Sequence, residues 1–128
     1  MNRREAERLN HQENTLRALG LSSAEAETLR LASMTLHRWA EHECNGTIQR
    51  DEETGKAYSV NPDSGRRWPV ADRETGALKR ARAIAEKHGL TLYHQADPRG
   101  AALYLLRPGD GPVGQDASAY YSRGVVVY

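Results

Sequence analysis

The segment LTLYHQADPRGAALYLLR, at residues 90–107, holds two apolar runs on either side of a turn signal. Pro98 presets φ at the second position of a turn, and Asp97 can accept hydrogen bonds from the backbone that follows it. Gly100 tolerates the geometry with which the chain leaves such a turn. The segment therefore predicts a β-hairpin.

A third strand is expected to complete this sheet. Residues 123–128 contain a β-branched run, Val125 to Val127, which favours a buried strand. An isolated hairpin is marginal in water, and a third strand supplies much of the missing stability. The sequence thus predicts a three-stranded antiparallel sheet made of residues 90–95, 101–107 and 123–128.

One long helix is predicted over residues 22–44. Ser22 and Glu25 have the spacing of a capping box at its start. Apolar residues then recur at steps of three and four, so one face of the helix should cover the core. The expected core positions are Leu29, Leu36 and Trp39.

Two further helices are predicted. The helix over residues 73–88 has Asp72 as a suitable N-cap and ends at Gly89, with apolar residues on one face and cations on the other. The helix over residues 3–19 has a thin apolar face, formed by Leu9, Leu16 and Leu19. We expect this N-terminal helix, within residues 1–20, to be peripheral, with its first turns frayed or docked only against a partner chain.

The segment 47–70 changes to short extended pieces. Two units, ETGKAY at residues 53–58 and DSGRRW at residues 63–68, share a pattern of an acid, a hydroxyl residue, Gly, a cation and an aromatic residue three positions after Gly. Such spacing suits two successive hairpin turns with Gly in a left-handed conformation. We therefore predict an irregular β-hairpin arm with strands at residues 48–50, 56–60 and 67–70.

These elements predict an α+β fold in a single domain, residues 1–128. Helices pack on the three-stranded antiparallel sheet, and the arm at residues 47–70 separates the long helix from a second unit, residues 72–128, that holds a helix and the sheet. A chain of this length suits one core.

Composition excludes several classes of protein. Hydrophobic residues make up 38% of the chain and charged residues 27%, which argues against a disordered tail. A net charge of +1 creates no global field toward nucleic acid or an anionic membrane. The single cysteine excludes an internal disulfide, and neither a signal-peptide pattern nor an apolar run of about 20 residues is present. The cytoplasm is the expected compartment, without a membrane partner.

No convergent catalytic or metal-binding set stands out. On a helix, His37 and His42 point about 140° apart, and His42 and Cys44 about 200° apart, so we expect no metal site. Cys44 beside His42 lacks an assignable oxyanion donor, which argues against a thiol nucleophile. His94 and Asp97 flank the hairpin turn and are the one candidate acid–base pair, although the turn already explains Asp97. The sequence predicts no cofactor and favours a protein that is not an enzyme.

Aromatic and basic residues are the main surface candidates, because Trp, Tyr and Arg anchor many protein interfaces. The residues expected to bind a partner are Tyr58, Arg66, Arg67, Trp68, Tyr120, Tyr121 and Arg123. Cations beside aromatic rings also suit nucleic acid, which needs phosphate neutralisation and base stacking. The nucleic-acid hypothesis uses a first cluster, Arg66, Arg67 and Trp68, and a second basic cluster, Lys79, Arg80 and Arg82. Acidic residues interrupt both clusters, and a solvated helix face and hairpin rim are the favoured explanation for these cations.

Three stretches resemble segments of small uncharacterised proteins encoded by bacteriophages and prophages: GRRWPV at residues 65–70, the hairpin at residues 97–108, and YYSRGVVVY at residues 120–128. The resemblance extends over residues 35–128. It implies no catalytic residues, because none are established for that family. It implies a setting, the cytoplasm of a bacterial host cell, where small non-enzymatic phage proteins bind host or defence machinery, CRISPR complexes among them.

The expected function is that of a small phage accessory protein that binds a host or anti-phage defence macromolecule and inhibits it without catalysis. Three alternatives stay open: a nucleic-acid-binding protein, a small virion or assembly component, and an enzyme that uses His94 and Asp97. Residues 1–44 are a further candidate for contact between copies of the chain.

Overall fold

The computed structural model describes residues 2–97, 99, 102–110 and 117–128 and has an α+β fold, as predicted. Its helices are α1 (Arg3–Arg17), α2 (Ser23–Cys44), α3 (Arg73–Lys87) and α4 (Ala117–Arg123). Its strands are β1 (Ile48–Arg50), β2 (Ala57–Val60), β3 (Arg67–Pro69), β4 (Thr91–His94), β5 (Leu103–Leu106) and β6 (Val125–Val127). No described helix is both long enough and apolar enough to cross a bilayer.

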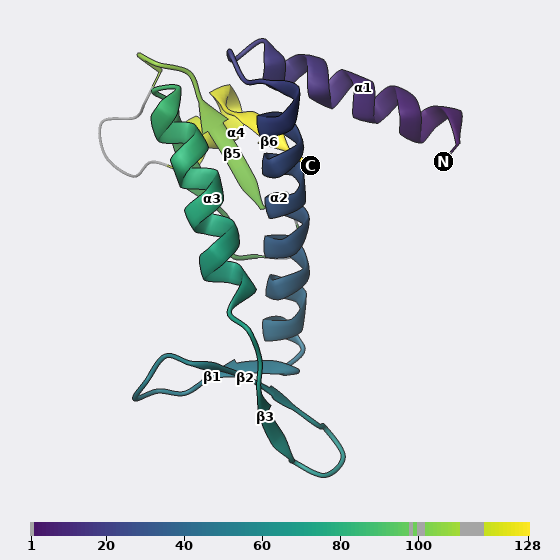
Figure 1. Cartoon of the computed structure of the whole chain (residues 1–128), viewed down its shortest axis with the longest axis vertical. Helices are drawn as coiled ribbons and strands as arrows, with labels where there is room; N and C mark the ends of the chain where they lie inside the picture. The colour runs from purple at the N-terminus through teal and green to yellow at the C-terminus, as the bar shows by residue number, and fades with distance from the viewer. Residues whose placement is uncertain (1, 98, 100–101, 111–116) are drawn as a thin grey trace.

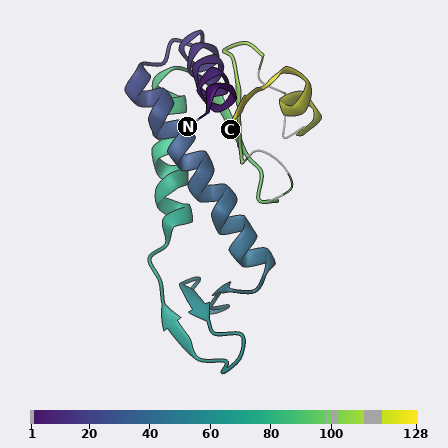
Figure 2. The same cartoon turned by 90° about the vertical axis from the view of Figure 1, so that its right-hand side faces the viewer.

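The molecule is elongated along α2 and α3, which lie side by side (Figures 1 and 2). The sheet β4-β5-β6 and α4 pack near one end of this helix pair, and the sheet β1-β2-β3 forms an arm at the other end. We call residues 47–70 the arm and the remaining elements the body. The arm predicted at these residues is thus confirmed, as a separate three-stranded antiparallel sheet.

The predicted three-stranded sheet of the body is also confirmed, with antiparallel strands in the order β4-β5-β6. The central strand β5 is buried on both faces. Leu103 and Leu105 are 0% exposed and belong to the main core, whereas Tyr104 and Leu106 form a second cluster on the other face. In the turn between β4 and β5, Pro98 and Gly100 lie outside the described residues.

Helix α4 covers the second face of the sheet and was not predicted. Tyr120 is 4% exposed, and its ring stacks on that of Tyr93 with 4.9 Å between centroids. A side chain at Gly124 would collide with the carbonyl oxygen of Tyr120, so only glycine fits the step from α4 to β6. Part of the loop predicted before this helix, residues 111–114, lies outside the described residues.

The two long helices follow their predicted patterns. The capping box of α2 is present, and Leu29, Leu36 and Trp39 are buried. In α3 the buried positions are the small residues Ala77, Ala81 and Ala85, which allow the helix to approach α2 closely.

Glu25 ties the start of α2 to the end of α3. Its carboxylate accepts a hydrogen bond from the backbone of Ser22 and lies 3.0 Å from Nε2 of His88 and 3.2 Å from Nζ of Lys87. The backbone hydrogen bond and the His88 contact lower the pKa of Glu25 from its ordinary 4.5 to about 2. The two helices are therefore clamped at the end of the body away from the arm.

Helix α1 is anchored to its own chain by its C-terminal half. Leu16 is 0% exposed in the main core, and Oε1 of the buried Gln12 accepts a hydrogen bond of 2.7 Å from the backbone N–H of Tyr128. The expectation of docking only against a partner chain concerned the first turns of α1, and this anchoring of the second half leaves it a prediction. The long-range contact with Tyr128 has no local sequence signal and was not predicted. The N-terminal half of α1 projects away from the other elements of the body (Figure 1).

Candidate functional site

The arm is built from two similar turns. Gly55 and Gly65 have φ of +72° and +73°, the left-handed values expected for these turns. In each turn the glycine N–H donates to a backbone carbonyl four residues earlier, that of Asp51 or Asn61, at 2.8 Å. The side chains of these two residues accept further backbone hydrogen bonds inside the turns. The turns are thus specified locally, and they fix the strand register.

The register separates the arm residues onto two faces. Tyr58 pairs with Pro69 and Val60 with Arg67, so these side chains share one face, which we call the outer face. Trp68 pairs with Ser59, which in turn pairs with Ile48, and these residues share the opposite face. We call it the inner face, because Arg50 reaches from it toward the helices of the body.

On the outer face, Arg67 lies over the ring of Tyr58, with 4.7 Å from its guanidinium carbon to the ring centroid. The hydroxyl of Tyr58 donates to Oε1 of Gln49 at 3.1 Å. All three residues of the edge strand β3 are exposed. One of them, Pro69, has no N–H, which blunts this edge against the addition of another strand.

Arg50 joins the arm to both long helices. Its guanidinium makes a bidentate contact with Asp72 at 3.0 and 3.2 Å and contacts Glu74 at 3.1 Å, next to the start of α3. It also lies 3.6 Å from Glu43 and 5.5 Å from the ring centroid of Trp39, both on α2. The guanidinium of Arg50 lowers the pKa of Asp72 to about 2, while burial raises the pKa of Glu74.

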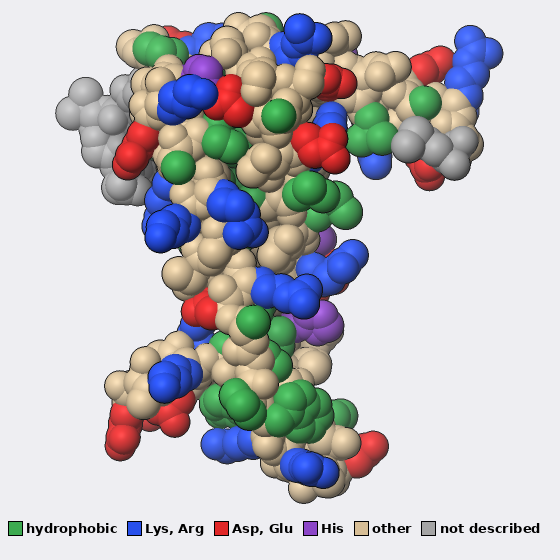
Figure 3. Space-filling model, in the orientation of Figure 1, with side chains coloured by type: hydrophobic (Ala, Val, Ile, Leu, Met, Phe, Trp, Pro, Cys, Tyr) green, Lys and Arg blue, Asp and Glu red, His purple; other side chains and the backbone are tan. Residues whose placement is uncertain are grey.

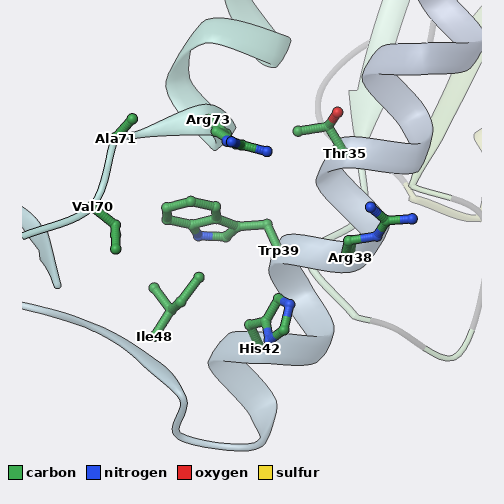
Figure 4. A pocket seen from close by; sticks show the side chains of 8 residues that line it. All are labelled: Thr35, Arg38, Trp39, His42, Ile48, Val70, Ala71 and Arg73. Carbon is green, nitrogen blue, oxygen red and sulfur yellow. The ribbon is translucent and has the colours of Figure 1, made fainter. Parts of the chain in front are cut away.

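A cleft of about 370 Å³ lies where α2, α3 and the inner face of the arm meet (Figure 4). We call it the Trp39 cleft. Its apolar lining includes Trp39, Ile48 and Val70. Arg73 from α3 extends toward the indole, and Arg38 of α2 also lines the cleft, with its guanidinium turned away from the indole in Figure 4. The full lining is Thr35, Arg38, Trp39, His42, Ile48, Val70, Ala71 and Arg73.

Trp39 is held rigidly within this cleft. Its Nε1–H donates to Oε1 of Glu43 at 2.6 Å, and only 4% of the residue is exposed. The exposed aromatic ring of the arm is Trp68, which is 44% exposed. Trp68 shares the inner face with Ile48. Val70, two residues after Trp68, lies on the same face, and its N–H donates to the carbonyl of Ala57.

The structure divides the residues expected to bind a partner into two groups. Tyr58, Arg66, Arg67 and Trp68 all lie on the arm, whereas Tyr120, Tyr121 and Arg123 lie on α4 near the other end of the molecule (Figures 1 and 2). Tyr120 is 4% exposed and packs in the second buried cluster, so it offers no exposed ring on this surface. Tyr121 is 54% exposed, with its hydroxyl 3.0 Å from Oε1 of Gln95.

The second basic cluster lies apart from the arm. Lys79, Arg80 and Arg82 are exposed on α3, in the body. Figure 3 shows Lys and Arg side chains spread over α3 down to the narrow part of the molecule, with hydrophobic side chains gathered on the arm below. The two basic clusters of the nucleic-acid hypothesis therefore lie on different elements, the arm and α3.

The candidate acid–base pair is not formed among the described residues. The carboxylate of Asp97 contacts Arg99, at 2.6 Å in the closest pair, and no described hydrogen bond joins it to His94. His94 is half-buried, and this burial, together with Arg82, lowers its pKa. The described residues also contain no group of three potential metal ligands, and Cys44 is an exposed free thiol.

A second exposed apolar patch lies between α1 and α2. Leu31, Met34 and Tyr128 are each more than half exposed, and with Leu9 they line a groove of about 500 Å³. This patch lies largely within residues 1–44, where contact between copies of the chain was expected.

Sequence reasoning missed Arg50 and the cleft. Arg50 contacts Asp72 and Glu74, which are 22 and 24 residues away in the chain, so no local spacing could reveal the network. Trp39 was correctly predicted to be buried, but its side chain lies near Ile48 and Val70 of the arm and is not part of the main core cluster.

Comparison of the chain with protein-family models finds no match, and neither a curated protein nor a solved structure matches it significantly. The candidate site is therefore defined by its own geometry.

Acid is expected to destabilise the protein through Glu25 and Asp72. Their pKa values fall from 4.5 and 3.8 to about 2 on folding, so the unfolded chain binds more protons in this interval. The stabilisation is fully present at a pH above the unfolded-state pKa values of these groups, and it is lost as the pH falls through their folded-state pKa of about 2. Glu74 acts in the opposite direction, because its pKa is raised.

Urea denaturation at several pH values between 4.5 and 2 checks this prediction. The free energy of unfolding should fall steadily with pH, and Glu25→Gln should flatten that fall. A free energy that stays constant over the interval would contradict the assigned contacts.

Proposed function

We propose that this protein is a non-catalytic binding protein and that its partner docks on the inner face of the arm, at Trp68 and the adjoining Trp39 cleft. The observation that carries the proposal is Trp68, a large aromatic ring that is 44% exposed on the same face of the arm as Ile48, which lines the cleft. Rigid aromatic anchors next to pockets are typical of the residues that dominate binding energy in protein interfaces.

The arm has no role in the apolar core that would explain its aromatic residues. Neither of the two clusters of buried apolar residues in the described chain includes a residue of β1, β2 or β3. The network of Arg50 nevertheless holds the arm in a defined position against α2 and α3. A small sheet that is fixed in place and exposes an aromatic ring is suited to recognition.

Mixed charge favours a protein partner over nucleic acid. The arm carries the exposed cations Lys56, Arg66 and Arg67, but Glu52 and Glu53 are exposed on its first turn and Asp63 on its second, and the whole chain has a net charge of only +1. A phosphate backbone is bound by several clustered cations, and the neighbouring acids repel phosphate and weaken that attraction. Because Pro69 blunts the edge strand, the side chains of the arm are the better recognition elements.

The resemblance to small phage-encoded proteins supports a more specific form of this proposal. The partner is then a host or anti-phage defence protein in the bacterial cytoplasm, of which a CRISPR complex is one example, and binding inhibits it. Contact between copies of the chain through residues 1–44 stays a prediction, supported by the exposed patch of Leu31, Met34 and Tyr128.

Replacement of Trp68 tests the proposal. Trp68→Ala should weaken binding by about 2 kcal/mol or more, which is about 30-fold, because an anchor ring is lost. Its thermal midpoint should stay near that of the parent chain, because β3 lies outside the core. The measurements are titration of a partner captured from phage-infected bacterial cells, and thermal unfolding of each variant.

Tyr121→Ala is the matched control, since Tyr121 is an exposed ring on α4 in the body. This control should keep partner binding. Loss of binding in Tyr121→Ala alone would refute the proposal, as would tight, salt-sensitive DNA binding that Arg66→Glu with Arg67→Glu abolishes.

A further inference from the structure

The Trp39 cleft has a fixed apolar floor. Ile48 and Val70 lie beside the indole of Trp39, and Figure 4 shows all three side chains turned toward the same space. The volume of about 370 Å³ falls at the lower end of the range for ligand sites, about 300–1,000 Å³. The floor therefore suits one large apolar side chain.

The rim of the cleft carries unused positive charge. Arg38 projects from α2 and Arg73 from α3, with His42 nearby, and no carboxylate is among the lining residues. Within the described part of the chain, neither Arg38 nor Arg73 has an ion pair or a side-chain hydrogen bond. Guanidinium groups pair well with carboxylates, so the rim is complementary to an anionic ligand.

The acids closest to this rim are already engaged. Glu43, Asp72 and Glu74 all contact Arg50, which lies over the ring of Trp39 and is not among the residues that line the cleft. These carboxylates are thus gathered on Arg50, and none of them forms an ion pair with Arg38 or Arg73 among the described residues.

The closed position of Trp39 argues against a nucleotide base. Base stacking needs an open ring face, but Trp39 is 4% exposed and Arg50 covers its ring at 5.5 Å. An aliphatic or aromatic side chain that fills the space between Trp39, Ile48 and Val70 needs no such face.

We propose that the Trp39 cleft binds an acidic peptide segment of the partner protein, with one apolar side chain in the cleft and flanking carboxylates on Arg38 and Arg73. The inference rests on the proposed function and specifies the chemistry of its partner. From the cleft the segment continues over the inner face of the arm to Trp68, which shares that face with Ile48.

The two tryptophans of the chain make this inference measurable. In a Trp68→Phe background, Trp39 is the sole source of indole fluorescence. The probes are an acetylated, amidated peptide EELFEE, its basic counterpart KKLFKK, its counterpart EEASEE without the apolar pair, and an oligothymidylate of similar length. None of them contains tryptophan, so any change in emission comes from Trp39.

The acidic apolar peptide should change Trp39 emission saturably, with a dissociation constant on the order of 100 µM. Both altered peptides and the oligothymidylate should bind about tenfold more weakly or not at all. Arg38→Gln combined with Arg73→Gln should weaken binding of EELFEE by about tenfold or more. Arg4→Gln combined with Arg17→Gln on α1 removes the same charge elsewhere and should leave binding unchanged.

Absence of saturable binding of EELFEE up to about 1 mM overturns the inference, as does equal or tighter binding of KKLFKK or the oligothymidylate. Equal effects of the two double substitutions also overturn it, because the attraction would then be non-specific. These outcomes are independent of the capture experiment with Trp68→Ala. Peptide binding without Trp68-dependent capture refutes only the proposed function, and the reverse result refutes only the inference.

Discussion

Removal of residues 124–128 is expected to leave the protein unable to fold. The deletion takes away β6, whose Val125 and Val127 are 9% and 0% exposed in the main core. It also removes the carbonyl of Val127, which accepts a hydrogen bond of 2.7 Å from the hydroxyl of the buried Ser33. The edge of β5 is left unpaired, and such an edge promotes aggregation.

Circular dichroism and size-exclusion chromatography of the shortened chain check this prediction. Tyr128→Ala is the matched control, because the side chain of Tyr128 is 65% exposed while its backbone N–H still donates to Gln12. The control should fold normally. A shortened chain that stays monomeric with an unchanged thermal midpoint would contradict the role of β6 in the core.

Replacement of Arg50 by methionine is expected to detach the arm from the body. Arg50→Met keeps an apolar stem against Trp39 but removes the only cation in contact with Glu43, Asp72 and Glu74 among the described residues. These groups are partly buried, so the cost should lie between those of exposed and buried ion pairs, at about 2 kcal/mol. The arm amides should exchange with deuterium faster, while the amides of β5 stay protected.

Two variants make the Arg50 prediction specific. Arg30→Met removes a single ion pair, 3.5 Å from Glu27 on the same helix, and should cost less than about 1 kcal/mol. Glu74→Gln added to Arg50→Met should recover part of the loss, because it relieves repulsion among the remaining carboxylates. An Arg50→Met protein with normal exchange in the arm would mean that the network does not position the site.

The elements with local signals were predicted well. The capping box at Ser22 and Glu25 and the glycine turns at Gly55 and Gly65 each involve residues a few positions apart, so spacing alone indicates them. Helix α4 lacks such a signal, because its position depends on the contact of Tyr120 with Tyr93, far away in the sequence. Because α4 was not predicted, the burial of the second face of β5, where Tyr104 and Leu106 pack with Tyr120, was not predicted either.

The candidate site was predicted only in part. The repeated turn units correctly placed Tyr58 and Trp68 on neighbouring strands, but side chains alternate between faces, and the register puts these two rings on opposite faces. The distribution of aromatic residues between the arm and α4 depends on the whole fold. The cleft itself requires Trp39, Ile48 and Val70 to meet from three separate segments, which no sequence pattern expresses.

Photo-crosslinking in bacterial cells tests the central claim most directly. A benzoylphenylalanine is placed at position 68 in one chain and at position 121 in another, so that each exposed ring reports what lies beside it. Binding through the inner face of the arm predicts a discrete crosslinked partner protein from position 68 and none from position 121. Crosslinks from position 121 alone, or crosslinks from position 68 only to nucleic acid, would contradict the account.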